Sequence, residues 1–423
     1  MPRQAGSSDT STRGGSGSRA AASNPTLAGA PCVNPIRLRG YYQRVDASTG
    51  EVLALLGSTA APRGIVLVAC KDRRASCCPT CARLYERDAY HLIASGLRGG
   101  KTVPATVGTH PAVMLTLTAP SFGAVHGIRE RGQPCKCGRH HQADDPHIGA
   151  AIDPATYRYT EQAVWNHYAP ELWRRTVKAI RQGVASALGV PRSALPNVAR
   201  VRFAKVAEFQ RRGVVHYHAI IRIDGPDGVD SPPPAHCTGS LLQEIETGAA
   251  DFATIALPGV LMGELGLAPD RRLRWGPQRD AVALDLVTCT RAAGYIAKYA
   301  TKATETVTGG PVIKPIRSRQ QLDRIELTEH GRTLIAASWT VGERTGIEGF
   351  KRWSHQFGYG GHTLTKSRQY STTFAALRAA RTEWRSTDDG DVIVRAQLTY
   401  AGRGHGRSRT LLVQRPGPPE SKP

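Results

Sequence analysis

The feature that most constrains the fold is an apolar run with two histidines, residues 214–223 (VVHYHAIIRI). Its β-branched residues predict a strand. Side chains two apart in a strand share a face, so His216 and His218 lie together and Tyr217 faces the other way. The two imidazoles start about 7 Å apart and can converge on one metal ion. Histidines hydrogen-bonded within an ordinary core are the alternative.

Two further segments predict a sheet around this strand. Residues 112–118 form one strand, and residues 200–209 form another, joined to the histidine strand by a turn at 210–213. Glu208 then lies near His216 across the hairpin and would complete a two-histidine, one-carboxylate metal site. A solvated charge at the hairpin end is the alternative, and a single residue of register decides between them.

Helical periodicity marks residues 160–188, with a break or fresh start at Pro170, and a further strand is expected at 281–287. Residues 95–102 (SGLRGGKT) resemble a phosphate-binding loop. That loop needs a glycine where Ser95 stands, a strand before it and a helix after it. A helix precedes it here and Pro104 follows, so we expect no ATP site.

A second chemical segment is the predicted helix at residues 291–302. At about 100° per residue, Tyr295, Tyr299 and Lys302 fall within an arc of about 60°, with Lys298 at its border. A phenolate at pH 7 costs about 4 kcal/mol, which neighbouring ammonium groups reduce. A metal that polarises a phosphate lowers the remaining barrier, so the pattern favours phosphodiester transesterification. A solvated amphipathic face is the alternative.

Nine cysteines, several of them clustered, indicate metal-binding thiolates in a cytoplasmic protein. Cys78 and Cys81 form a Cys-x-x-Cys knuckle, and Cys32 and Cys70 would complete a structural zinc site. Free thiols are the alternative.

A candidate second metal site lies further along the chain. Its ligands would come from Cys135, Cys137, His140 and His141, with His147 nearby.

Charge points to the partner. Lysine and arginine number 56 against 34 acidic residues, a net charge of +22, which favours nucleic acid. No apolar run approaches the roughly 20 residues of a membrane span, and the start lacks a signal peptide, so we expect a soluble, cytoplasmic protein with no membrane partner.

The 423 residues divide into five predicted regions. These are a disordered basic tail (1–30), a cysteine-rich zinc-binding region (31–110), a catalytic domain (111–308), a basic DNA-binding region (309–400) and a disordered tail (401–423). Aromatic residues are interleaved in the fourth region and suit stacking on bases. Packing in an ordinary core is the alternative. These residues are Trp339, Trp353, Phe357, Tyr359 and Tyr370.

Three ordered motifs resemble those of HUH endonucleases, specifically rolling-circle replication initiators of actinobacterial plasmids and integrative elements. They are residues 115–118 (LTLT), 208–218 (EFQRRGVVHYH) and 295–302 (YIAKYATK). The resemblance implies an α+β fold with an antiparallel sheet of the ferredoxin-like or RNA-recognition-like type and flanking helices, beside the cysteine-rich region.

The resemblance also implies roles. His216 and His218 would bind Mg²⁺ or Mn²⁺ with Glu208 as third ligand. Tyr299 would attack origin DNA, because Lys298-Tyr299-x-x-Lys302 matches the family pattern, and leave a 5′-phosphotyrosine with a free 3′-hydroxyl. Tyr295 stands where relatives have a glutamate, so a second nucleophile and a supporting residue both stay open.

Such an initiator would bind double- and single-stranded origin DNA and work with a host helicase and a single-strand binding protein. The same chemistry would serve a conjugative relaxase or a single-strand transposase. A non-catalytic, zinc-containing DNA-binding regulator is the alternative from a different class.

Overall fold

The structure is a computed structural model that describes residues 32–57, 65–129, 132–266, 272–302, 304–310, 315–385 and 392–404. The predicted N-terminal tail, residues 1–30, lies outside the described residues. Of the predicted C-terminal tail, only residues 401–404 lie inside, at the end of a strand.

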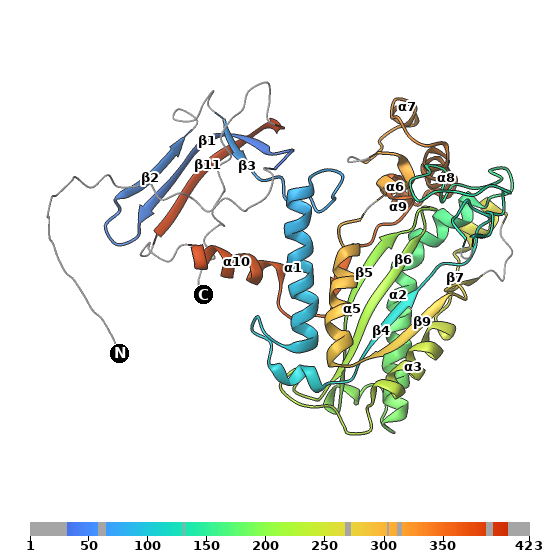
Figure 1. The fold of residues 1–423 in the computed structure, drawn as a ribbon, viewed down its shortest axis with the longest axis horizontal. Helices are drawn as coiled ribbons and strands as arrows, with labels where there is room; N and C mark the ends of the chain where they lie inside the picture. The colour runs from blue at the N-terminus through green and yellow to red at the C-terminus, as the bar shows by residue number, and fades with distance from the viewer. Residues whose placement is uncertain are drawn as a thin grey trace, which may run out of the picture.

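The chain has the predicted α+β architecture, with antiparallel sheets (Figure 1). The larger sheet has five strands in the order β10-β5-β6-β4-β9. In that order the strands are Leu364–Lys366, Arg200–Phe209, Val215–Asp224, Ala112–Leu117 and Arg279–Leu284. The histidine strand, β6, is central as predicted, and β5 and β6 form the predicted hairpin.

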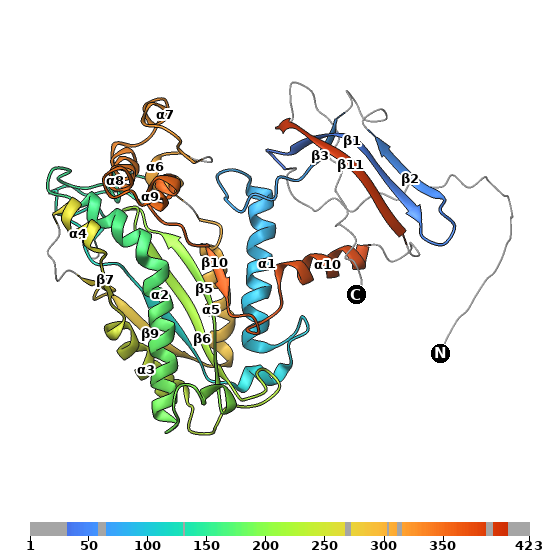
Figure 2. The ribbon, with the colours of Figure 1, turned by 180° about the vertical axis from the view of Figure 1, so that it is seen from behind.

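All ten residues of β6 are buried, because helices cover both faces of the sheet. Tyr217 and its alternate neighbours pack in a core with the long helix α2, Tyr159–Ala187. Ile220, on the histidine face, packs in a second core with α1 (Pro79–Arg98) and α5 (Leu286–Tyr299). Figures 1 and 2 show α2 and α5 on opposite faces of the sheet.

The expected break at Pro170 is wrong, since α2 continues through it. A proline inside a helix removes one backbone hydrogen bond. Trp165, Ala169 and Trp173 are buried on both sides of this position, and their packing holds the helix together. The predicted strand at 281–287 is also shorter. It ends at Leu284, because the Asp285 side chain caps α5 by accepting from two backbone N–H groups.

Helix α2 fixes the turn of the β5–β6 hairpin. The Asn166 amide donates to the carbonyl of Gly213 (2.9 Å), and its oxygen accepts from the N–H of Val215 (3.0 Å). Gly213 has φ +77°, a conformation that favours glycine. Helix α2 thereby helps to fix the register of the hairpin, in which Glu208 pairs with His216.

A second sheet joins the two ends of the described chain. Its strands, β1 (Ile36–Asp46), β2 (Val52–Gly57), β3 (Val66–Val68) and β11 (Val392–Arg403), pair antiparallel around β1. Helix α1 lies between this sheet and the central one (Figures 1 and 2). The boundary predicted at residue 401 therefore falls inside β11, and residues 309–400 contribute to both sheets.

The remaining elements are further helices and one further pair of strands. They are α3 (Gly239–Phe252), β7 (Ile255–Ala256), α4 (Gly259–Leu265), β8 (Arg272–Leu273), α6 (Glu305–Thr308), α7 (Arg319–Asp323), α8 (Glu329–Thr345), α9 (Glu348–Arg352) and α10 (Phe374–Arg385). Residues 95–98 are the end of helix α1, so they do not form the loop between a strand and a helix that a phosphate-binding loop requires. Among the described helices, none combines the length and apolarity needed to span a membrane.

The five aromatic residues predicted to stack on bases divide into two groups. Phe357, Tyr359 and Tyr370 are buried core side chains, so stacking on bases is wrong for these three. Trp339 and Trp353 are half-buried, and Trp339 donates its indole N–H to Glu343 (2.7 Å).

Candidate active site

The hairpin register brings the predicted metal ligands to one face of the sheet. Glu208 lies directly opposite His216 across the ladder, and Val206 lies opposite His218. Directly opposite residues share a face, so both imidazoles and the carboxylate point the same way. The ring centroids of His216 and His218 are 4.5 Å apart, and Nε2 of His218 is 3.5 Å from a Glu208 oxygen.

Two threonines, Thr116 in β4 and Thr118 just after it, orient the histidines. The hydroxyl of Thr118 lies 2.9 Å from Nδ1 of His216, and that of Thr116 lies 3.3 Å from Nδ1 of His218. Each imidazole therefore keeps its Nε2 for another partner. Sequence reasoning assigned these threonines no role. The spacing of two residues between Thr116 and Thr118 could have indicated this role, because it equals the spacing of the two histidines on the paired strand.

Both tyrosines of α5 reach the histidines. The ring of Tyr299 stacks on His218 with centroids 4.8 Å apart and planes 22° apart. Tyr295 contacts the same imidazole edge-on at 5.3 Å and contacts Tyr299 at 4.9 Å. Tyr299 is half-buried, whereas Tyr295 is 45% exposed. The strand and the helix thus meet as the sequence analysis required.

The predicted lysines behave differently from each other. Helix α5 ends at Tyr299, so Lys302 lies beyond it and not within the predicted helical arc. Its ammonium nevertheless donates to Glu208 (2.7 Å) and lies over the ring of Tyr299, 4.4 Å from the centroid. Lys298 is exposed on the last turn of α5. Lys302 is therefore the cation that contacts both a predicted ligand and a predicted nucleophile.

These contacts shift the protonation of the site. Burial raises the pKa of Glu208, but the interactions with His218 and Lys302 outweigh it and leave the pKa below its usual value. Burial, the Tyr295 hydroxyl and the charge of Glu208 all raise the pKa of Tyr299. Burial lowers the pKa of His216 to about 4, so its imidazole is neutral at pH 7, the form that binds metals.

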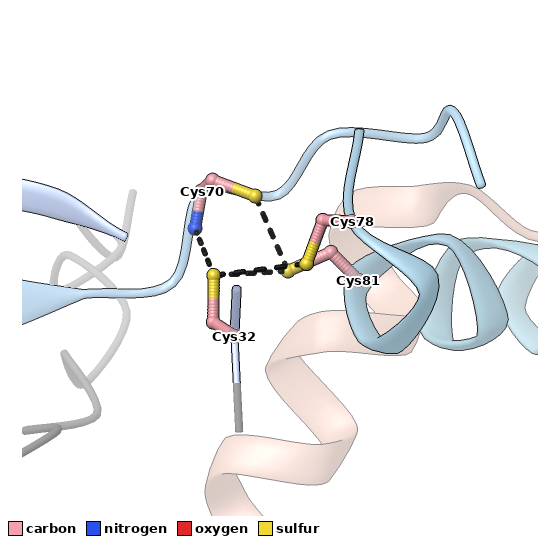
Figure 3. A group of neighbouring side chains, drawn as sticks. All are labelled: Cys32, Cys70, Cys78 and Cys81. Carbon is pink, nitrogen blue, oxygen red and sulfur yellow. Dashed lines mark hydrogen bonds between the residues drawn. The ribbon is translucent and has the colours of Figure 1, made fainter. Parts of the chain in front are cut away.

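Four predicted zinc ligands also come together, in what we call the four-cysteine group: Cys32, Cys70, Cys78 and Cys81. Cys32 precedes β1 and Cys70 follows β3, and the pairing of Ile36 with Val68 brings these two segments side by side. The other two cysteines stand at the start of α1 (Figure 3).

The sulfur separations in the four-cysteine group match a tetrahedral zinc site. Cys81 Sγ lies 3.6 Å from that of Cys70 and 3.8 Å from that of Cys32, and Cys78 and Cys32 are 3.8 Å apart. Zn–S bonds of about 2.3 Å place tetrahedral sulfurs about 3.8 Å apart. A disulfide needs about 2.05 Å. Burial opposes ionisation, yet backbone N–H groups of Cys81 and Val33 hold the pKa of Cys78 at about 7.

The four-cysteine group is tied to the end of the tyrosine helix. Arg73, between Cys70 and Cys78, donates to the carbonyls of Ala300 (3.2 Å) and Lys302 (2.9 Å). Ser76 donates to the carboxylate of Glu305 (2.5 Å). Sequence reasoning missed this link, because it joins residues more than 200 positions apart.

A second group, the cysteine–histidine group, consists of His126, Cys135, Cys137 and His141. It differs from the predicted set in one member: His126 joins it, and the exposed His140 does not. Hydrogen bonds to the Asp145 carboxylate and to Cys137 raise the pKa of His141 to about 9. His147 lies 2.9 Å from Asp145 and contacts the His126 ring edge-on, but it contributes no ligand atom to the group.

These two groups are tighter than the sheet site. Among the described residues, only they bring three or more ligand atoms of cysteine, histidine or carboxylate within 4.8 Å of one another. In the sheet site, the Glu208 carboxylate is shared between His218 and Lys302. The ligand atoms of the sheet site are accordingly more widely separated than those of either group.

Comparison with known proteins supplies the family. The family described as replication initiator protein, pSAM2 (RepSA), matches residues 21–415. The chain belongs to this replication initiator family. A replication initiator protein of Streptomyces ambofaciens is 40% identical over 401 residues, covering 90% of this chain and 86% of the relative. No solved structure matches significantly.

The family match confirms the resemblance to plasmid replication initiators that the three motifs indicated. It covers the sheet site, the four-cysteine group and the cysteine–histidine group together.

Proposed function

We propose that this replication initiator is an HUH-type enzyme that nicks and rejoins DNA at a plasmid origin through a 5′-phosphotyrosine intermediate. The observation that carries the proposal is the stacking of Tyr299 on His218 beside Glu208 and Lys302. His218 and Tyr299 lie about 80 positions apart in the chain, and the fold brings their rings into contact. A protein that only binds DNA would not require this contact. The net charge of +22 suits a DNA substrate.

The residues fit a divalent cation. Two imidazoles whose Nδ1 atoms lie against threonine hydroxyls, together with an ionised carboxylate, form a two-histidine, one-carboxylate set. We propose that His216, His218 and Glu208 hold Mg²⁺ or Mn²⁺. When bound, the ion would polarise the scissile phosphate and stabilise its developing charge.

The chain's own residues would carry out the transfer. The Tyr299 oxygen forms a bond to phosphorus, and the bond from phosphorus to the 3′-oxygen breaks. The phenol loses one proton and the departing 3′-oxygen takes up one, so the reaction is balanced. Tyr299 is protonated at pH 7 because its pKa is raised, and its proton must leave during the attack. Lys302, over the ring, stabilises the negative charge that develops there.

The phosphotyrosine retains the energy of the cleaved phosphodiester, so a 3′-hydroxyl can reverse the step without ATP. The free 3′-hydroxyl would prime synthesis. Unwinding would then depend on a host helicase, with a single-strand binding protein covering the displaced strand. The four-cysteine group would bind Zn²⁺ in a structural role.

The decisive test is covalent capture. Single-stranded oligonucleotides that tile the replication origin are incubated with the protein and Mg²⁺ or Mn²⁺, and adducts are resolved in SDS. An SDS-resistant adduct that requires the metal is expected. Salt-sensitive binding with no adduct on any oligonucleotide would instead indicate the non-catalytic regulator.

Matched tyrosine variants assign the nucleophile. Tyr299→Phe keeps the stacked ring and loses only the hydroxyl, so it should bind DNA and form no adduct. Tyr295→Phe should retain the adduct. If the two results are reversed, Tyr295 is the nucleophile, and if both variants form half the adduct, the enzyme uses both tyrosines.

A further inference from the structure

The connection between β4 and α2 contains little regular structure, yet it holds the cysteine–histidine group at its centre. Nε2 of His141 lies 3.2 Å from Nδ1 of His126 and 3.2 Å from Sγ of Cys137. All four ligand atoms lie within 4.8 Å of one another. Four side chains from one irregular connection thus point their metal-binding atoms at one place.

These separations suit zinc. Tetrahedral Zn²⁺ with Zn–N bonds of about 2.05 Å and Zn–S bonds of about 2.3 Å places nitrogens about 3.3 Å apart and a nitrogen and a sulfur about 3.6 Å apart. Two thiolates and two imidazoles are a common structural zinc set. None of the nine cysteines forms a disulfide, so no such bond accounts for the approach of Cys135 and Cys137.

A carboxylate orients one of the ligands. Nδ1 of His141 lies 2.6 Å from Asp145, which also accepts from the backbone N–H of His147 (2.8 Å). Nδ1 keeps its proton toward Asp145, and Nε2 therefore faces the other members of the group. This carboxylate–histidine arrangement is typical of metal-binding histidines, whose tautomer it fixes.

The connection docks on the hairpin of the sheet site. The Arg211 guanidinium donates to the carbonyl of Ala143 (2.9 Å), and that of Arg212 donates to the carbonyl of Pro120 (3.0 Å). Gly149 lies so close to Arg211 that an added Cβ would be 2.4 Å from its carbonyl carbon. Arg211 and Arg212 form the turn between the strands of Glu208 and His216.

We propose that the cysteine–histidine group is a second structural zinc site, which holds the β4–α2 connection against the β5–β6 turn. This site is separate from the four-cysteine group and goes beyond the proposed nicking function. Its ligands are His126, Cys135, Cys137 and His141. Binding releases to solvent the thiol protons and any proton on the imidazole nitrogens that bind the metal.

Metal analysis of the full chain tests the site. Wild-type protein and variants are purified without chelator, and zinc per chain is measured by mass spectrometry. His126→Ala and Cys137→Ser should each hold one zinc fewer than wild type. His140→Ala is the matched control, an exposed neighbour outside the group, and should equal wild type.

Zinc content equal to wild type in both His126→Ala and Cys137→Ser overturns the proposal. The comparison is with wild type and uses no activity, so it stands whether or not the four-cysteine group binds zinc or the enzyme nicks DNA. If those variants are insoluble, Asp145→Asn keeps all four ligands. It should weaken one zinc by about 10- to 100-fold in competition with a chelator, and an unchanged competition curve overturns the proposal.

Discussion

The sheet site and the four-cysteine group are built from the same kind of convergence but differ in openness. Four buried thiols converge in the cysteine group, where backbone N–H groups also donate to the sulfurs of Cys32 and Cys70. In the sheet site, Glu208 and Lys302 form an ion pair and Tyr295 is 45% exposed. Structural zinc sites are closed, whereas catalytic metal sites keep open positions. The contrast agrees with the proposed structural role of the first region and the proposed catalytic role of the second.

The two regions are nevertheless in contact. Arg73 donates to the backbone carbonyls at the end of α5, and α1, which begins at the cysteine group, packs along α5. Loss of the cysteine group should consequently alter the packing around Tyr295 and Tyr299, whereas substitution of His216 or His218 should leave the cysteine group intact.

The largest effect is expected from His218→Ala. It removes a proposed ligand and the surface on which Tyr299 stacks. Loss of a metal effect worth several kcal/mol predicts a fall in adduct formation of about 10³-fold or more. DNA binding and zinc content should be unchanged. His236→Ala, at an exposed histidine, is the control; cleavage by His218→Ala at the control's rate contradicts the metal assignment.

Loss of the four-cysteine group should act on structure first. Cys78→Ser combined with Cys81→Ser removes two thiols, and one zinc per chain should be lost. Because zinc binding and folding are coupled, hydrogen exchange should rise in the first turns of α1. The neighbouring Cys77→Ser, at a buried cysteine outside the group, is the control. Equal zinc in the double variant and this control would mean the group binds none.

The threonines that orient the histidines should tune the metal without abolishing cleavage. Thr118→Val keeps the shape of the side chain and removes the hydroxyl 2.9 Å from His216. Loss of such an outer partner predicts about 10- to 100-fold weaker Mn²⁺ binding. Calorimetric titration measures it, with the exposed Thr247→Val as control. An affinity equal to that of the control would show that Thr118 does not orient the ligand.

The smallest effect on chemistry is expected on the opposite face of the sheet. Lys205 is buried there with its ammonium 4.0 Å from the centroid of Tyr217, and burial lowers its pKa from 10.5 to about 7. The shift corresponds to about 5 kcal/mol of net destabilisation of the ammonium form. Lys205→Met should therefore stabilise the fold by up to about 5 kcal/mol at pH 7, with adduct formation unchanged.

The pH dependence of Lys205 has a definite sign. Between pH 7 and 10.5 the unfolded chain binds more protons than the folded one, so wild-type stability should rise with pH. The advantage of Lys205→Met should shrink over the same window. Chemical unfolding at pH 7 and pH 10 measures both, with the exposed Lys178→Met as control. A constant difference between the two pH values would contradict the shifted pKa.

Much of the site was predictable because its signals are local. The two-residue spacing of His216 and His218 fixes a shared face in any strand, and the four-residue spacing of Tyr295 and Tyr299 fixes a shared face in any helix. The apolar pattern placed β4, β5, β6 and α2 close to their observed bounds. Local rules failed where packing or a cap overrode them, at Pro170 and at Asp285.

By itself, the sequence determined the residue types, the strand and helix that carry them and the polyanionic partner, since these follow from composition and short-range periodicity. Only the tertiary structure decided that Glu208 pairs with His216, that Lys302 reaches the site from beyond its helix, and that β11 pairs with β1. It also replaced His140 with His126 in the cysteine–histidine group. Each of these depends on register or on contacts between distant segments, for which spacing along the chain carries no signal.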